Sequence, residues 1–161
     1  MKFSDWRVTV EIIAALSIVI SLVFVGLELR QSTSQARINA YQSFSISLSE
    51  FARDISHDPV FSDLLARTGS LESYESASPT ERIQLYTHYV GLLHLYNGLY
   101  QSVHEGLLLD KNLEAIYNDP AFGNDYIKAL WPTIENMFEP NYREFIKRTI
   151  IESNTTNQGV T

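Results

Sequence analysis

Arg82, Tyr86 and Tyr89 are the residues whose types and spacing best suit ligand binding. Steps of four and three positions place them on one side of a helix. Arg82 stands in the first turn after Ser78-Pro79, where the helix dipole disfavours a cation, and no acidic residue lies three or four positions away. A guanidinium beside two phenol rings can hold a small anionic ligand such as a nucleotide. The alternative is a solvated or inter-helix arginine.

The four histidines do not indicate a metal site. His88 and His94 are the closest pair, and they stand six positions apart rather than the four of a helical zinc site. There is no His-Glu-x-x-His motif, and the absence of cysteine excludes disulfides, thiolate catalysis and cysteine-based zinc sites. We therefore expect no metal and no cofactor.

No arrangement of residues predicts an enzyme. The acidic residues mostly occupy positions where they would cap helices or form salt bridges. A Ser-His-Asp triad stays compatible with the composition, but no Gly-x-Ser-x-Gly motif and no glycine-rich phosphate loop is present. We expect a protein without catalytic activity.

The whole net charge of −7 lies in the C-terminal part of the chain. Residues 1–57 hold five basic and five acidic side chains, whereas residues 58–161 hold seven basic and fourteen acidic ones. Binding to nucleic acid depends largely on neutralising phosphates, so this balance argues against DNA or long RNA as partners. A local basic pocket for a small anion is still compatible with it.

Residues 8–27, VTVEIIAALSIVISLVFVGL, predict a single transmembrane helix. Twenty residues at about 1.5 Å each span about 30 Å, the thickness of the bilayer's hydrocarbon core. The uncharged run 12–27 exceeds the roughly 7–15 residues of a cleaved signal's apolar core. Trp6 and Arg30 are suitable interface anchors at its two ends. The alternative is a buried helix of a soluble protein.

The orientation of this span depends on the basic residues that flank it. Lys2 and Arg7 on one side balance Arg30 and Arg37 on the other, but basic residues continue along the C-terminal side to Arg53. We expect the C-terminal domain in the cytoplasm.

One face of the span carries small and polar residues at heptad spacing. Positions 14, 17, 21, 24 and 28 form this seam, in which Phe24 is the apolar member. Small and hydroxylated residues allow transmembrane helices to approach one another and form hydrogen bonds. The seam predicts a homo-oligomer, while the alternative is a chance scatter of serines. The other seam residues are Ala14, Ser17, Ser21 and Glu28.

The span is expected to continue into an amphipathic stalk, residues 31–57. No Gly or Pro interrupts 28–57, and apolar residues recur at steps of three and four along one face. We divide the chain into the N-terminal flank and span (1–30), the stalk (31–57), a helical domain (58–152) and a disordered tail (153–161). The stripe that would dock the stalk onto the domain consists of Tyr41, Phe44, Leu48, Phe51 and Ile55.

The remainder predicts an all-α fold, a compact bundle of about five helices. Asp58-Pro59 begins a helix that ends at Arg67 before Gly69, and residues 69–78 are expected to form a polar linker. Ser78-Pro79-Thr80-Glu81 is a capping box that opens a long helix ending near Glu105.

Three further helix starts follow, at Asp110, Asp119-Pro120 and Glu139-Pro140. Pro132 is expected to kink or end the second of these helices. The last helix is expected to carry i,i+4 salt bridges between Glu139 and Arg143 and between Glu144 and Arg148.

Several stretches resemble a group of uncharacterised bacterial single-pass membrane proteins. They are EIIAALSIVISLVFVGLELRQSTSQAR with the following Ala40-Tyr41-Gln42, YNGLYQSVHEGLLLD (96–110) and FEPNYREFIKRTI (138–150). The resemblance implies a bacterial inner-membrane location and an N-terminal span followed by a helical domain, but no activity and no functional residue.

A second resemblance is architectural. A membrane region followed by a small helical domain is similar to the membrane effectors of type III CRISPR defence, in which a cyclic oligoadenylate bound to an oligomer's soluble domain perturbs the membrane. This implies a sensor or effector that binds a small anionic ligand in antiviral defence and acts on its membrane segment. The alternative function is a membrane-anchored scaffold or adaptor that binds a protein partner without ligand gating.

Overall fold

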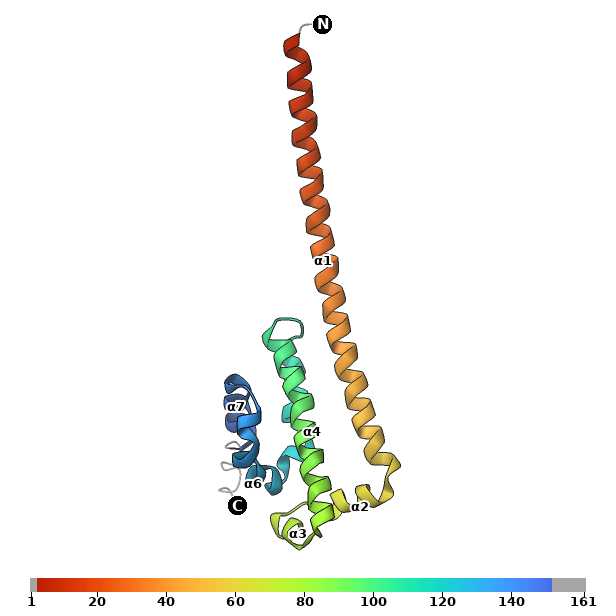
Figure 1. The fold of residues 1–161 in the computed structure, drawn as a ribbon, viewed down its shortest axis with the longest axis vertical. Coiled ribbons are helices and arrows are strands. Elements are labelled where there is room, and N and C mark those ends of the chain that lie inside the picture. The colour runs from red at the N-terminus through yellow and green to blue at the C-terminus, as the bar shows by residue number, and fades with distance from the viewer. Residues whose placement is uncertain (1–2, 152–161) are drawn as a thin grey trace. The chain divides into compact units, whose positions relative to one another are not determined.

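The computed structural model describes residues 3–151, and all regular elements in this range are helical. The prediction of an all-α chain is therefore confirmed for the described residues: a long N-terminal helix precedes several shorter ones (Figure 1). The predicted tail, 153–161, lies outside this range. The chain divides into two compact units, Met1–Asn39 and Ala40–Thr161. The bounds of the four predicted segments stay a prediction.

Helix α1, Phe3–His57, supplies all the described structure of the first unit. Its most apolar stretch has a mean hydropathy of 2.6, and none of that stretch is buried. Ser17 and Ser21 donate their hydroxyl protons to the carbonyl oxygens of Ile13 and Ser17, at 2.9 and 2.8 Å. The serine hydroxyls are thus satisfied within the helix, although the surrounding side chains are exposed and apolar.

The second unit contains the C-terminal part of α1 and all later helices. Helix α2, Pro59–Arg67, begins as predicted, because Asp58 Oδ1 accepts hydrogen bonds from the backbone N–H groups of Val60 and Phe61 at 3.0 Å. Helix α4, Pro79–His104, begins with the predicted capping box. The backbone N–H of Ser78, together with its hydroxyl and Arg67, lowers the pKa of Glu81 to about 2. These caps explain why both helices start at the predicted residues.

The second half of this unit is made of short elements. The chain leaves α4 through Gly106, whose φ of +73° favours glycine. Short 3₁₀ turns connect the helices and a π-helical turn ends the described chain. The elements are the 3₁₀ turns Asp110–Leu113, Pro120–Gly123 and Glu135–Met137, the helices α5 (Glu114–Tyr117), α6 (Asp125–Ile134) and α7 (Pro140–Ile146), and the π-helical turn Lys147–Ile151.

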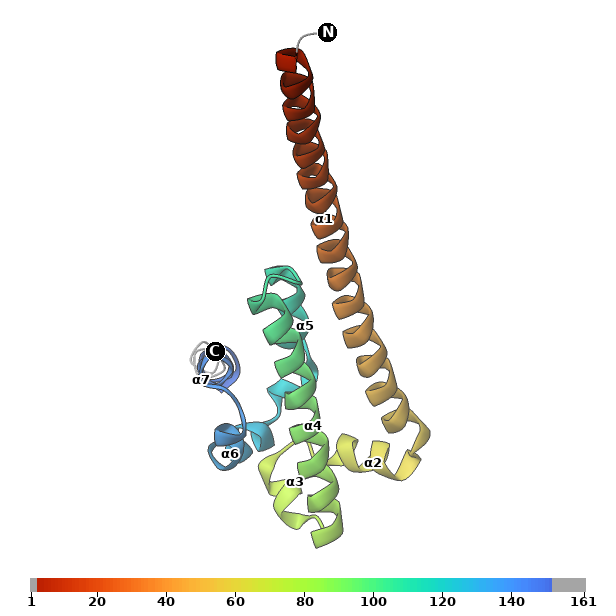
Figure 2. The same ribbon diagram turned by 45° about the horizontal axis from the view of Figure 1, so that its top comes forward.

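Helix α4 is central to the second unit. Both ribbon views show it between the C-terminal part of α1 and the segment that contains α6 and α7 (Figures 1 and 2). The predicted stripe of α1 is largely confirmed, since Phe44 and Phe51 pack against the core and Leu48 and Ile55 are half-buried. Tyr41 is 54 % exposed, because the core begins to cover α1 only from Phe44. The buried α4 residues are Leu85, Tyr89, Leu92, Leu93, Tyr96 and Leu99.

The structure corrects the expected linker at residues 69–78. Helix α3, Leu71–Ser76, occupies most of it. The Ser70 hydroxyl accepts a hydrogen bond from the backbone N–H of Ser73 and caps this helix. The expected terminator Gly69 has no positive φ, and Thr68 ends α2 by donating its N–H to the Leu64 carbonyl.

The helices expected at Asp110 and at Asp119-Pro120 are also corrected. Asp110 lies inside a 3₁₀ turn, and Asp119 caps only the turn Pro120–Gly123. Helix α6 starts later, because the Asn124 side chain accepts the N–H of Tyr126 at 2.8 Å. It continues past Pro132 to Ile134, and the burial of Ile134 holds this last turn in place.

Neither predicted i,i+4 salt bridge of the last helix is among the ion pairs of residues 3–151. Arg143 Nη1 donates to Asn136 Oδ1 at 3.0 Å, and Glu139 accepts from the Gln101 side chain. For Glu144 and Arg148 the reason is geometric, since α7 ends at Ile146 and a π-helical turn follows. The wider turn removes the spacing on which the predicted pair depended.

Candidate functional site

Arg82 forms contacts between α3 and α4. Its Nε donates to the carbonyl oxygen of Ala77 at 2.8 Å, and its Nη2 donates to that of Glu75 at 2.6 Å. Its guanidinium carbon lies 5.9 Å from the centroid of the Tyr74 ring. The arginine therefore holds the end of α3 against the start of α4. This is the inter-helix contact that the sequence offered as the alternative to ligand binding.

Tyr89 and Tyr86 follow Arg82 along α4 but have different surroundings. Tyr89 is 4 % exposed, and its hydroxyl accepts a hydrogen bond from Asn124 Nδ2 at 2.8 Å. Burial raises the pKa of Tyr89, although the Asn124 bond opposes this. Tyr86 is half-buried and packs at the edge of the core. Ligand binding by these two tyrosines and Arg82 stays a prediction.

Asn124 links three helices, a role that the sequence pattern does not predict. Its Nδ2 donates to the carbonyl oxygen of Thr68 at 3.3 Å as well as to the Tyr89 hydroxyl. Thr68 is buried, and its own hydroxyl donates to the Leu64 carbonyl. The only signal for Asn124 in the sequence is its suitability as a helix cap before Asp125.

Asp119 is a carboxylate whose two oxygens both have structural partners. Oδ2 accepts the hydroxyl proton of Tyr96 at 2.6 Å, and Oδ1 accepts the N–H of Ala121 at 2.8 Å. Burial and then the bond to Asp119 hold the pKa of Tyr96 above its usual range. This pair joins α4 to the turn before α6.

A surface groove of about 530 Å³ lies where the end of α1, the start of α2 and the first half of α4 meet. We call it the α1–α2–α4 groove. A Cβ on Gly91 would lie 3.6 Å from Phe51 Cε2, an ordinary van der Waals distance, so α1 and α4 are close neighbours at this point. The groove is lined by Phe51, Asp54, Ile55, Asp58, Phe61, Ile83, Gln84, Thr87, His88 and Gly91.

His88 lies among aromatic rings from three helices. Its ring stacks on Phe51 with 4.8 Å between centroids, and it meets Phe61 and its neighbour Tyr89 edge to face at 5.3 and 5.2 Å. Burial lowers the pKa of His88 to about 4, although the charge of Asp119 opposes this shift. His88 is therefore a neutral part of the groove wall at pH 7.

The charged residues lining the groove are acidic. Asp54 and Asp58 line it, and no Lys or Arg is among its lining residues. Asp58 uses one carboxylate oxygen to cap α2. Ile83 at the rim is 67 % exposed, so the groove presents apolar surface to solvent beside two carboxylates.

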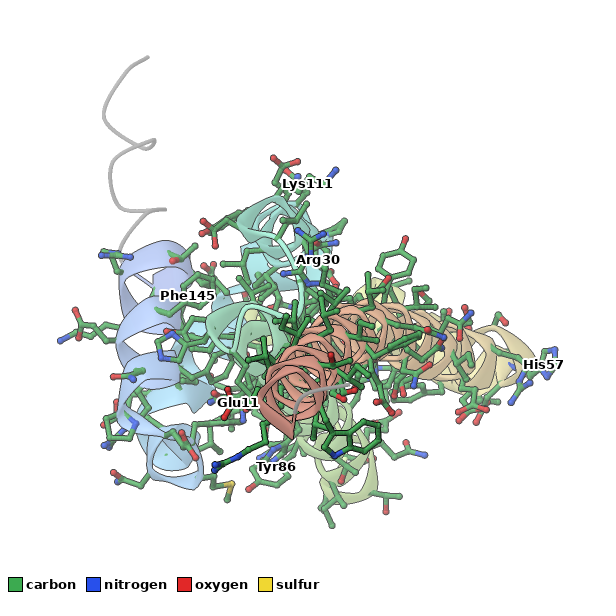
Figure 3. The ribbon with its side chains drawn as sticks, turned by 90° about the horizontal axis from the view of Figure 1, so that it is seen from above. Glu11, Arg30, His57, Tyr86, Lys111 and Phe145 are labelled. Carbon is green, nitrogen blue, oxygen red and sulfur yellow. The ribbon has the colours of Figure 1, made fainter. Side chains whose placement is uncertain are left out.

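The other histidines do not gather into a metal site. Within the described residues, no group of three or more His, Cys, Asp or Glu side chains could hold a metal ion. His94 packs near Phe138 and His104 near Tyr100, with 4.7 and 6.1 Å between ring centroids. His57 projects from the end of α1, well apart from Tyr86 on α4 (Figure 3).

The seam residues Ala14, Ser17, Ser21 and Glu28 are all exposed on α1. The homo-oligomer that this seam predicts stays a prediction.

Neither the comparison with protein-family models nor the searches of curated proteins and of solved structures find a match. The two resemblances remain predictions, and so does the expectation that the chain is not an enzyme.

Proposed function

We propose that this protein is a membrane-anchored adaptor. Its N-terminal helix crosses a bacterial inner membrane once and associates with a second copy through the seam of residues 14–28. The helical domain lies on the cytoplasmic side and recognises a protein partner there. The observation that carries this proposal is that the most apolar stretch of α1 is not buried anywhere in the chain.

An exposed apolar surface of this extent is unusual in a soluble protein. The side chains from Ile12 to Leu27 include large aliphatic groups that are all more than half exposed. Burying apolar surface contributes roughly 25 cal/mol per Å², so a bilayer strongly stabilises such a segment. Insertion into lipid supplies the burial that the chain itself does not.

The surroundings of Arg82 favour an adaptor over a ligand-gated effector. Two of its donors already bind backbone carbonyls, and the α1–α2–α4 groove is apolar and acidic rather than basic. An apolar groove with a charged rim suits a protein partner better than a small anion.

A ligand-gated effector is the second candidate, supported by the absence of Gly and Pro between residues 28 and 57. An uninterrupted helix could carry a change in the domain to the membrane. A specific nucleotide or cyclic oligonucleotide that raises the midpoint of thermal unfolding of the full chain would favour it. Copurification of one protein partner, with no response to nucleotides, would favour the adaptor.

Alkaline carbonate extraction tests the anchor. We expect the full 18.4-kDa chain to stay in the membrane pellet and to be released only by detergent. Arginine at both Val19 and Ile20 should release the chain, because each costs about 2.5–3.5 kcal/mol at a span's centre. Ile46→Arg is the matched control, since Ile46 is an exposed apolar residue of α1 outside the span. Two results would refute the anchor: a wild-type chain shortened by removal of a signal sequence, or a wild-type chain released by carbonate.

Cysteine labelling tests the orientation. The chain has no cysteine, so Gln42→Cys introduces a unique thiol on an exposed position of α1. A membrane-impermeant maleimide should label it only after the cells are opened. Labelling in intact spheroplasts would place the domain on the outer side.

A further inference from the structure

We propose that the α1–α2–α4 groove is the docking site for a basic amphipathic helix of a partner protein. The partner would place apolar side chains against Ile83 and Phe61 and a Lys or Arg against Asp54 and Asp58. This inference rests on the proposed adaptor function and specifies the chemistry of the partner.

The first argument is exposed apolar surface. Ile83 is 67 % exposed at the rim, while Phe51, Ile55 and Phe61 are half-buried in the wall. Val60, on the first turn of α2, is also largely exposed. Apolar side chains from three helices thus meet at one solvent-facing site, which is typical of surfaces that receive an amphipathic helix.

The second argument is charge complementarity. The Asp54 carboxylate forms no hydrogen bond or ion pair in the described part of the chain, and Asp58 has one carboxylate oxygen that takes no part in its two capping bonds. His88 is neutral at pH 7 and adds no positive charge. Because no Lys or Arg lines the groove, both carboxylates favour a cationic partner.

The same charges make a second copy of this domain a poor occupant. Residues 58–161 carry fourteen acidic side chains against seven basic ones, so two such surfaces repel one another. A free small molecule is also less suitable, since drug-sized ligands bury most of their surface in a pocket whereas this groove has an exposed rim. A helix can cover the rim and insert side chains into the 530 Å³ beneath it.

Fluorescence anisotropy with two labelled synthetic peptides tests the proposal. Both are amphipathic helices with the same leucine face; one carries lysine on its polar face and the other glutamate. The full chain is used in nanodiscs of phosphatidylcholine, and empty nanodiscs give the background. We expect the lysine peptide to bind and the glutamate peptide not to bind. Added salt should weaken binding, because the Debye length falls from about 10 Å at 0.1 M to about 3 Å at 1 M.

Three variants change the groove, and a fourth is the control outside it. Ile83→Ser should weaken binding by about tenfold through lost apolar contact. The pair Asp54→Asn and Asp58→Asn should weaken it by about fivefold and flatten the salt dependence, while asparagine still caps α2. Thr87→Arg, in the groove wall, should also weaken it by repulsion. Ile46→Ser, at an exposed position outside the groove, should leave the affinity unchanged.

Equal binding of the two peptides, or no binding of the lysine peptide, would overturn the groove proposal. An equal loss with Ile46→Ser would do the same. Circular dichroism of each variant shows whether it is folded, and Thr87→Arg and Ile83→Ser change exposed positions. Carbonate extraction is scored separately, so a released chain refutes the adaptor, whereas an anchored chain that binds no peptide refutes only the groove.

Discussion

We expect His88 to make the stability of the second unit depend on pH. The unfolded chain takes up a proton at this residue near pH 6.5, whereas the folded chain does so only near pH 4. Between these values the unfolded state binds more protons, so the free energy of unfolding decreases as the pH falls. The stability is fully present above about pH 6.5 and is lost progressively down to about pH 4.

The size of the loss follows from the shift. A change from 6.5 to about 4 corresponds to about 3 kcal/mol for a fully shielded group. His88 is partly exposed beside the groove, so solvent screening reduces the expected loss to about 1–2 kcal/mol. Other groups also titrate in this range, and the contribution of His88 must be isolated by comparison with variants.

Urea unfolding of the full chain in a non-ionic detergent, followed by circular dichroism, measures this contribution. His88→Phe keeps an aromatic ring against Phe51 and Phe61 but cannot be protonated. Between about pH 7 and pH 4.5 the free energy of unfolding should decrease in both proteins, but the decrease in the His88→Phe variant should be about 1–2 kcal/mol smaller than in the wild type. His88→Gln should show the same reduced dependence, because glutamine cannot be protonated in this range either.

The same dependence on pH in the wild type, His88→Phe and His88→Gln would refute this reasoning. It would mean that water solvates the His88 imidazolium in the groove as effectively as in the unfolded chain.

Three further predictions concern hydrogen bonds and the seam. Tyr142→Phe removes a buried hydrogen bond of 2.9 Å to a carbonyl oxygen of α4, and it should lower the free energy of unfolding in urea by about 1–2 kcal/mol. Tyr100→Phe removes an exposed hydrogen bond of 3.3 Å and should lower it by less than about 0.5 kcal/mol. Equal losses in the two variants would contradict this prediction. Asn124→Ala should cost about 2–4 kcal/mol in the same assay, because it removes a helix cap and leaves a buried carbonyl unpaired; a change below about 0.5 kcal/mol would show that the link is dispensable. Replacing Ser17 and Ser21 together with Leu should reduce the oligomer mass measured by light scattering in detergent, and an unchanged mass would exclude the seam as its cause.

The helix starts that the sequence predicted well are those with a local cause. Asp58-Pro59 and the capping box at Ser78 each need only residues three positions apart, and both form as predicted. Helix α3 was missed because GSLESYESAS is polar and serine-rich, although a serine in it acts as a cap. Pro132 does not end α6, which continues two residues beyond it to the buried Ile134, and the alternative of a kink at Pro132 stays a prediction.

The candidate site was harder to predict, because its partners come from distant segments. The spacing of Arg82, Tyr86 and Tyr89 describes one helix face, but it does not show that Arg82 reaches backbone carbonyls at the end of α3 and just after it. The α1–α2–α4 groove needs His88 beside Phe51 and Phe61, which belong to other helices. Helical periodicity does not show which helices will meet.

The link between Thr68 and Asn124 has a consequence for biosynthesis. The two residues are 56 positions apart, and a ribosome adding about 5–20 residues per second needs about 3–11 s to make the chain between them. During this time α2 and then α4 exist, but the Thr68 carbonyl and the Tyr89 hydroxyl lack the Asn124 amide that joins them to α6. The domain therefore closes only when its last third emerges. Slow codons just before residue 124 would lengthen the period in which its apolar faces are open to aggregation.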